Sequence, residues 1–279
     1  MLRTDWIDSH VHLWTPDTKR YPLAMGTDAA AVEPKNFSPE VLLRHARPSC
    51  VGRIVLVQTI LYGTDNSYML DAIERFPAVF RMVAIVDRNS ERLAAEMADL
   101  RERGVTGFRI IAPPNGADGW LKDAGYNKMF KTAATNGQAI CPLTHPDGLP
   151  DLDRMCGMYP DTAVVVDHMA RIGEQGAVDD SQIGMLCALA RHPNVYVKAS
   201  RFHSLGARKP PHDDLLPLIR RVLDAFGPQR VMWGSDSPFQ VLRETYEDSI
   251  AVIRDRLDLN DGDRWHVLAG TADKVFFDG

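Results

Sequence analysis

The chain alternates between short apolar runs and longer stretches in which apolar residues recur every three or four positions. Eight of the apolar runs are rich in β-branched residues and have the length of a strand. Their nearly continuous apolar character is typical of strands covered on both faces, as in a parallel sheet. The predicted strands span residues 6–13, 53–59, 80–86, 105–111, 139–144, 163–168, 195–200 and 230–236.

The stretches between these strands carry helix signals. Ser38 with Pro39, Asn66 and Ser90 each stand where a helix is expected to begin. The predicted helices cover residues 40–46, 67–76, 91–103, 124–136, 148–158, 180–192, 213–226, 241–257 and 261–277. Strands and helices that alternate in this way predict an α/β protein, a (β/α)8 TIM barrel that forms a single domain over residues 1–279.

The main alternative fold is a doubly wound open sheet. Its nucleotide-binding versions place Gly-x-Gly-x-x-Gly or Gly-Lys-Ser/Thr after a strand, and neither motif follows a predicted strand here. The barrel is therefore favoured. Its longest irregular segment, residues 15–37, would rise from the face that carries the chemistry in such barrels, as a lid or as a surface loop. Residues 116–125 and 201–213 are also expected to form walls of the site.

Composition narrows the function classes. The 279 residues are 45% hydrophobic and 25% charged, with a formal charge of −5, which argues against nucleic-acid binding and favours small-molecule chemistry. We expect a cytoplasmic protein without membrane contact, since no run is long enough to cross a bilayer, and leave a homo-oligomer open. The cysteines form no Cys-x-x-Cys pair and are expected in the core: Cys50, Cys141, Cys156 and Cys187.

The first predicted strand carries a pair of histidines, His10 and His12, near its end. Side chains two positions apart in a strand project from the same face, so these imidazoles can converge on one ion or one carbonyl oxygen. A His-x-His pair alone is weak evidence, because such histidines are often only solvated or hydrogen-bonded. The ends of the other strands decide between these interpretations.

Ionisable residues also end or closely follow other predicted strands. Arg109 lies in the fourth, His145 follows the fifth, His168 ends the sixth and Asp236 ends the eighth. A barrel brings strand ends together, and such residues at its C-terminal face indicate a site rather than a stabilising role. Thr59, at the end of the second strand, is a further expected substrate contact.

This residue set suits hydrolytic chemistry by either of two routes. His10, His12, His168 and Asp236 are suitable ligands for one divalent ion, Zn²⁺ first and Mn²⁺ second. Without a metal, the histidines can donate hydrogen bonds to a developing oxyanion while Asp236 acts as general base on water. Both routes stay open at this point.

Positive side chains near the same strand ends indicate an anionic substrate. Arg109 offers a planar fork for a carboxylate, although a structural ion pair would explain it equally well. Arg201 and His203, after the seventh strand, are expected substrate contacts, and His212 is a weaker one. Lys198 alternates with neighbours in that strand, so its side chain points either into the barrel or outward.

The chain resembles the amidohydrolase superfamily, in its amidohydrolase 2 branch, through segments 7–12, 164–169 and 232–238. Within that branch it is similar to lactonases of the 2-pyrone-4,6-dicarboxylate type, through residues 57–58, 63–67, 69–73, 107–109, 197–200 and 210–214. The resemblance implies hydrolysis of a cyclic ester. His10, His12 and His168 would bind or polarise the carbonyl, Asp236 would activate water, and Arg109 would hold a carboxylate. Relatives differ in their need for a metal.

The sequence departs from the dicarboxylate lactonases in the number and placement of its arginines. No second arginine follows Arg109, Arg201 is displaced, and His145 stands where another polar contact is expected. We therefore expect a different lactone with one carboxylate, from the breakdown of aromatic compounds or sugar acids.

Two alternative functions stay open: the same resemblance implies the first, and the fold alone allows the second. One is a metal-dependent decarboxylase resembling aminocarboxymuconate-semialdehyde decarboxylase, with His203 or His145 as its extra histidine. The other is a barrel whose site has decayed, which the presence of all four central residues disfavours.

Overall fold

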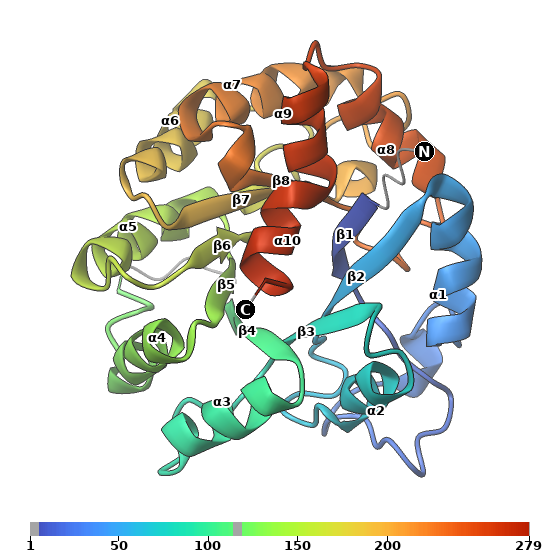
Figure 1. Cartoon of the computed structure of the whole chain (residues 1–279), viewed down its shortest axis with the longest axis vertical. Coiled ribbons are helices and arrows are strands. Elements are labelled where there is room, and N and C mark those ends of the chain that lie inside the picture. The colour runs from blue at the N-terminus through green and yellow to red at the C-terminus, as the bar shows by residue number, and fades with distance from the viewer. Residues whose placement is uncertain (1–5, 114–118, 279) are drawn as a thin grey trace.

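Eight parallel strands pair in chain order and form one barrel sheet (Figure 1). This computed structural model describes residues 6–113 and 119–278. The predicted TIM barrel is confirmed. The strands are β1 (Trp6–Val11), β2 (Val51–Val57), β3 (Phe80–Ala84), β4 (Val105–Ile111), β5 (Ala139–Leu143), β6 (Val164–Val166), β7 (Val195–Ser200) and β8 (Val231–Gly234).

The barrel closes where the end of β1 meets the residues that follow β8. The backbone N–H of Asp236 donates to the carbonyl oxygen of His10 over 2.9 Å, and that of His12 donates to Ser237 over 2.7 Å. Val11 and Ser237 form a parallel bridge between these hydrogen bonds. Closure therefore places the histidine pair directly beside Asp236.

Helices follow the strands around the barrel, close to their predicted positions (Figure 1). Within the described residues, none is long and apolar enough to span a membrane. They are α1 (Pro39–Ala46), α2 (Ser67–Arg75), α3 (Leu93–Glu102), α4 (Ala124–Asn136), α5 (Leu149–Met158), α6 (Asp180–Ala188), α7 (Leu216–Phe226), α8 (Tyr246–Arg254), α9 (Asp261–Trp265) and α10 (Thr271–Phe276).

Several predicted helices differ from the observed ones, and two of these differences have a clear local cause. The helix expected at 241–257 begins at Tyr246, because Thr245 caps it reciprocally with Asp248. The helix expected at 261–277 is continuous but contains a π-helical turn, His266–Gly270, between α9 and α10.

The C-terminal helix α10 closes the end of the barrel where the strands begin. Thr271 donates its hydroxyl to Pro228, which precedes β8, and Asp273 pairs with Arg53 at the start of β2. Phe276 packs with the apolar side chains of the barrel interior, among them Val55 and Val165. The barrel is thus filled from below, and its polar residues lie at the opposite end.

The expectation that all four cysteines lie in the core is wrong for Cys50, which is exposed, and only partly right for Cys187, which is half-buried. Cys50 has a φ of 61°, in the tight turn that leads into β2. Its side chain is therefore set by a turn and not by the apolar run that follows. Cys141 and Cys156 are buried as expected.

Candidate active site

A bulge in β1 turns the histidine pair into the barrel. Ile7 lies in the apolar interior, and strict alternation would place residue 10 on the opposite face. The pairing of β1 with β2 shifts register between Asp8 and Val11, and an extra residue of this kind reverses the faces that follow. His10 and His12 consequently both point inward.

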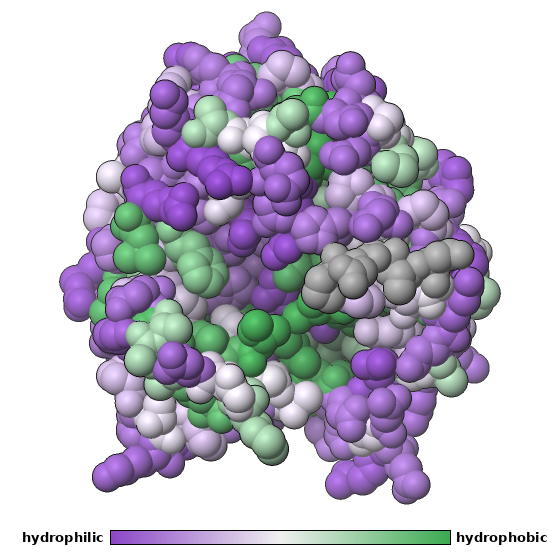
Figure 2. Space-filling view, turned by 180° about the vertical axis from the view of Figure 1, so that it is seen from behind, coloured by the Kyte–Doolittle hydropathy of each residue, from purple (hydrophilic) through white to green (hydrophobic). Residues whose placement is uncertain are grey.

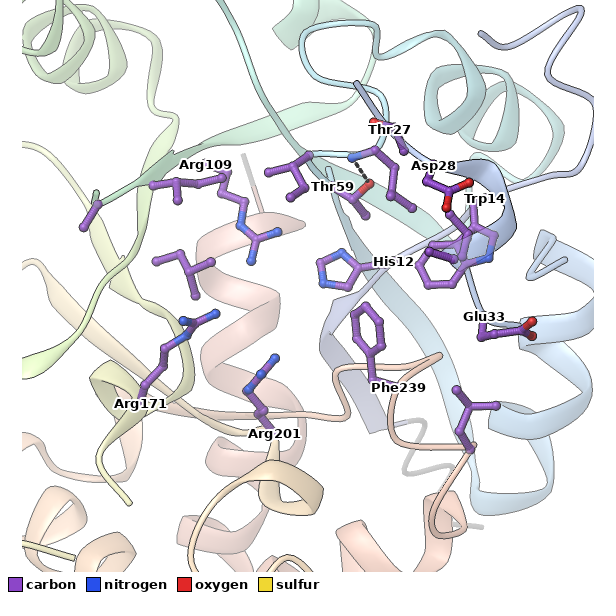
Figure 3. Close-up of a pocket in the computed structure, with 18 of the residues that line it drawn as sticks. His12, Trp14, Thr27, Asp28, Glu33, Thr59, Arg109, Arg171, Arg201 and Phe239 are labelled. Carbon is purple, nitrogen blue, oxygen red and sulfur yellow. Dashed lines mark hydrogen bonds between the residues drawn. The ribbon is translucent and has the colours of Figure 1, made fainter. Parts of the chain in front are cut away.

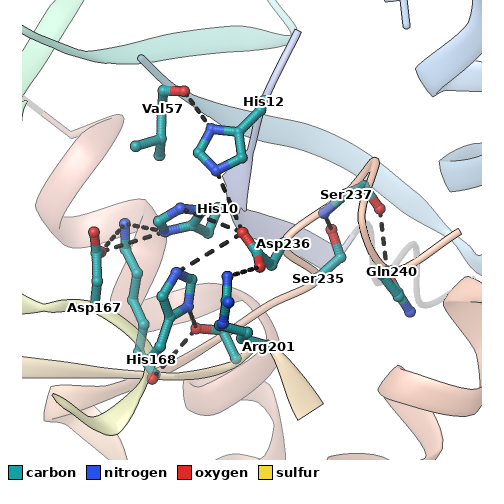
Figure 4. Close-up of polar contacts among 12 residues, drawn as sticks. His10, His12, Val57, Asp167, His168, Arg201, Ser235, Asp236, Ser237 and Gln240 are labelled. Carbon is teal, nitrogen blue, oxygen red and sulfur yellow. Dashed lines mark hydrogen bonds and ion pairs between the residues drawn. The ribbon is translucent and has the colours of Figure 1, made fainter. Parts of the chain in front are cut away.

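The carboxylate of Asp236 lies at the centre of a group of three imidazoles (Figure 4). Its Oδ1 is 3.3 Å from Nε2 of His12, and 3.8 Å from Nε2 of both His10 and His168. All four residues are buried. The structure therefore brings together the four residues that the strand ends predicted as a metal-binding or catalytic group.

Three residues at successive strand ends have a left-handed backbone. The φ angles are 56° at His168, 66° at Arg201 and 66° at Asp236, following β6, β7 and β8. This conformation is unfavourable for residues with a Cβ and persists only where the surrounding structure enforces it. Other described residues, among them Met169 and His212, also have positive φ, so the strained backbone extends beyond the residues whose side chains meet.

Protonation follows from the hydrogen bonds and the burial of this group. Nδ1 of His12 is 2.6 Å from the carbonyl oxygen of Val57, which can only accept, so Nδ1 carries a proton and Nε2 faces the Asp236 carboxylate. Burial lowers the pKa of His10 to about 3 and that of His168 well below its usual value. Burial would raise the pKa of Asp236, but His168, His12 and Arg201 outweigh it and lower that pKa strongly.

The buried atoms of this group have the properties of a metal site. Nε2 of His10, Nε2 of His168 and Oδ1 of Asp236 have no hydrogen-bond partner among the described residues. Unpaired buried polar atoms are costly, and a divalent ion would satisfy them. Two sets of donor atoms lie close enough to hold one ion: His10, His12 and Asp236, and His10, Asp167 and His168.

An ion pair lies behind His10, inside the barrel. Nζ of Lys198 is 3.1 Å from Oδ1 of Asp167 and 3.3 Å from Nδ1 of His10. Burial would raise the pKa of Asp167, but Lys198 and His10 outweigh it and hold that pKa well below its usual value. Lys198 therefore points inward, and Asp167 and Lys198 fix the orientation of His10 in the way that outer carboxylates orient metal-binding histidines. The sequence reasoning missed Asp167, although an acidic residue at the end of an apolar strand was a signal.

Arginines approach the group from two sides. Arg201 donates through Nη1 to Oδ2 of Asp236 over 3.0 Å. Arg109 donates through Nη1 to the carbonyl oxygen of Gln58 over 2.9 Å, and its Nε is 3.8 Å from Asp167. Arg109 is thus both held in the barrel mouth and available to the cavity above it.

A third arginine, Arg171, was not predicted and belongs to a cluster held by Glu174. The Glu174 carboxylate lies 3.7 Å from Arg171, 3.4 Å from Arg201 and 3.6 Å from Nδ1 of His145. One carboxylate therefore holds together two guanidinium groups and an imidazole. Both missed residues lie in the irregular segment after His168, where no periodic pattern gives the direction of a side chain.

His203 faces Asp236 from the segment after β7. Its Nε2 is 3.7 Å from Oδ2 of Asp236, and burial lowers its pKa to about 4. His212 does not join it at the cavity: it is buried and pairs with Glu244 over 2.7 Å. Of the two histidines expected after the seventh strand, His203 alone contacts the central carboxylate.

A cavity of about 770 Å³ opens above these residues (Figure 3). Arg109, Arg171, Arg201, His145 and Thr59 are among its lining residues. The segment expected as a lid, residues 15–37, supplies part of the wall through 27–28 and 31–33. Its closure over the site stays a prediction. Of the expected wall at 116–125, residues 116–118 lie outside the described residues.

Comparisons with known proteins agree with this geometry. The Amidohydrolase family profile matches residues 7–277. An L-fucono-1,5-lactonase of Burkholderia ambifaria is 31% identical over 247 residues, which cover 87% of this chain and 83% of that protein. A 2-pyrone-4,6-dicarboxylate hydrolase of Comamonas testosteroni is 29% identical over 251 residues, covering 87% of this chain and 79% of that protein.

The fold is shared with a crystal structure of an amidohydrolase from Burkholderia multivorans that has bound zinc. The TM-score is 0.80 at 22% identity, and the match covers 97% of this chain and 98% of the other. At this identity the likeness concerns the fold alone.

Proposed function

The chain belongs to the amidohydrolase family, and from this premise we propose that it is a lactonase that hydrolyses a small anionic lactone. Its relatives include an L-fucono-1,5-lactonase and a 2-pyrone-4,6-dicarboxylate hydrolase. The observation that carries the proposal is the Asp236 carboxylate, buried below an arginine-lined cavity and within 3.8 Å of three imidazoles.

Asp236 is the general base. Its lowered pKa keeps the carboxylate ionised, so it is available to accept a proton from the attacking water. The water oxygen bonds to the ring carbonyl carbon, the ring carbon–oxygen bond breaks, and the departing oxygen takes up the proton. The product is an open-chain hydroxy acid, and the new carboxylic acid releases its proton near neutral pH.

His10, His12, His168 and Asp236 would hold one divalent ion, for which we propose Zn²⁺ first and Mn²⁺ second. When bound, such an ion supplies Lewis acidity to the reacting carbonyl. Asp167 and Lys198 position His10 from below, and the carbonyl of Val57 holds the tautomer of His12. Without an ion, the histidines would polarise the carbonyl directly, and metal removal distinguishes the two routes.

Arg109 binds the substrate carboxylate. Its fork opens into the cavity, and the hydrogen bond to Gln58 fixes its position. Arg201 adds positive charge to the cavity, and Thr59 lies across from it (Figure 3). His145 also lines the cavity, with its Nε2 3.1 Å from Nη1 of Arg171. His203 is the remaining substrate-binding candidate, beside Asp236.

A second candidate function is decarboxylation, which the position of His203 favours. A decarboxylase of this branch is expected to have an extra histidine near a strand end, and of the two candidates, His203 and His145, His203 lies 3.7 Å from the Asp236 carboxylate. The products separate the two reactions, because decarboxylation releases carbon dioxide whereas lactone hydrolysis releases an acid and no gas.

The test is hydrolysis of a panel of carboxylated lactones, followed by a pH indicator and by carbon dioxide release. We expect proton release without carbon dioxide. Asp236→Asn should lower turnover about 10³-fold while the circular dichroism spectrum and melting temperature stay close to wild type, because the base is lost without a change of shape. Full activity in this variant would overturn the role of Asp236.

A further inference from the structure

We infer that the substrate carries an apolar body, such as an aryl or branched alkyl group, on the side of the lactone ring opposite its carboxylate. This inference rests on the proposed lactonase function and specifies its substrate class. It follows from the unequal character of the two sides of the cavity.

Positive charge is confined to one side of the cavity. Arg109 of β4, Arg171 after β6 and Arg201 after β7 project into it (Figure 3). His145 lies 3.1 Å from Nη1 of Arg171. Glu174 and Asp236 partly neutralise this group, so it suits one carboxylate better than several.

The opposite side of the cavity carries a group of exposed apolar side chains. Phe239 packs on Trp14, with ring centroids 5.7 Å apart, and on His12. Ile60 and Leu242 extend this wall and are 69% and 54% exposed, while Phe239 is 38% exposed. Large apolar side chains exposed together on one concave surface indicate that a ligand covers them. In Figure 2 hydrophobic residues gather along one side of a hydrophilic hollow.

Several polar atoms on this side already have a partner within the protein. Nε1 of Trp14 donates to Pro34, and Oγ1 of Thr59 accepts from the backbone of Leu61. Asp28 accepts from the backbone of Ala30, and Glu33 pairs with Lys35. The acceptors left for a polyhydroxylated ring are the second oxygens of the exposed Asp28 and Glu33 carboxylates, whereas hydroxyl groups placed against Phe239 would lose water without gaining a partner.

The test measures binding of two carboxylates that are not lactones, so it does not depend on hydrolysis. Calorimetry on the purified protein would compare trans-4-phenylcyclohexanecarboxylate with quinate, a polyhydroxylated cyclohexanecarboxylate. We expect the phenyl compound to bind at least about tenfold more tightly, from the apolar area it buries. Equal binding, or tighter binding of quinate, would overturn the inference.

Substitutions locate the effect. Leu242→Ser and Ile60→Ser should each reduce the preference for the phenyl compound several-fold, whereas Met158→Ser should leave it unchanged. Met158 ends α5, is similarly exposed at 53%, and is not among the residues that line the cavity. The inference would be contradicted if the two wall variants kept the full preference. It would also be contradicted if their sedimentation changed, because the wall would then be an interface between copies of the chain.

The same data separate this inference from the proposed function. Suppose that no lactone is hydrolysed, but the protein prefers the phenyl compound and the wall variants lose this preference. The proposed reaction is then wrong, while the inferred ligand class is supported. If lactones are hydrolysed but polyhydroxylated ones are preferred, the reaction stands and the inferred substrate class is wrong.

Discussion

Arg201 donates to Asp236 across 3.0 Å, so the proposed general base is paired with a cation from the neighbouring strand end. Both residues have a left-handed backbone, with φ of 66°. The pairing keeps the carboxylate ionised but also makes it a weaker base. A substrate carboxylate that draws Arg201 toward itself would weaken this restraint at the time of reaction.

Arg201→Gln should move the acid limb of the kcat/KM profile to higher pH. Removing the guanidinium removes one of the groups that lower the pKa of Asp236, so that pKa rises and the carboxylate protonates at a higher pH. The measurement is the pH dependence of lactone hydrolysis. Arg220→Gln, an exposed residue of α7, is the control, and an acid limb at the same pH in both variants would contradict the pairing.

Removal of metal should reduce activity about 100-fold or more, and zinc should restore it. The reason for this expectation is that the Nε2 atoms of His10 and His168 are buried without a hydrogen-bond partner, and a bound cation would satisfy them. Elemental analysis before and after dialysis against a chelator would give the metal content, and activity would be measured on the same samples. Undiminished activity in protein shown to be free of metal would instead favour direct polarisation by the histidines.

Lys198→Met should destabilise the protein by about 3 kcal/mol or more, because Asp167 would remain buried without its cation. Urea denaturation gives the free energy of unfolding. The matched control is Lys131→Met on the exposed side of α4, which should change stability by less than about 0.5 kcal/mol. If both substitutions cost the same, the buried pair contributes no more than a surface lysine.

Asp8 should make stability depend on pH in the direction opposite to an ordinary ion-paired carboxylate. Burial raises its pKa from 3.8 to about 6, so the native state binds this proton more tightly than the unfolded chain does. The contribution of this proton to the free energy of unfolding is fully present below about pH 4. It is lost as pH rises through 6, which lowers the free energy of unfolding by about 3 kcal/mol.

Asp8→Asn isolates this effect, because the variant has no titrating group at that position. The difference in unfolding free energy, variant minus wild type, should increase between pH 4 and pH 7. Denaturation curves at both pH values measure it, and a difference that does not vary with pH would show that Asp8 keeps an ordinary pKa in the fold.

The strands and helices could be predicted from the sequence because each strand is apolar and each helix has a regular period. The boundaries were harder. Tyr246 begins α8 only because Thr245 and Asp248 cap each other, and Cys50 belongs to a turn although the apolar run of β2 follows it directly. Local hydrogen bonds of this kind decide where an element begins, and they cannot be predicted from the spacing of apolar residues.

The central residues of the site could be predicted because a barrel brings its strand ends together. The correct fold brings His10, His12, His168 and Asp236 to the same end of the barrel, although the bulge that turns His10 and His12 inward has no signal in the apolar pattern. The inward direction of Lys198 and the positions of Arg171 and Glu174 could not be predicted in the same way. They depend on the register of a strand and on irregular segments, whose geometry comes from tertiary contacts.

Barrel closure between the end of β1 and the residues after β8 has a consequence for synthesis. The ribosome makes His10 and His12 more than two hundred residues before Asp236. During that interval the open edge of β1 has no partner strand, and even after His168 is made the nascent chain holds only three of the four residues of its catalytic group. Catalytic activity can appear only after the last strand has left the exit tunnel, so the onset of turnover during translation would report the moment at which the barrel closes.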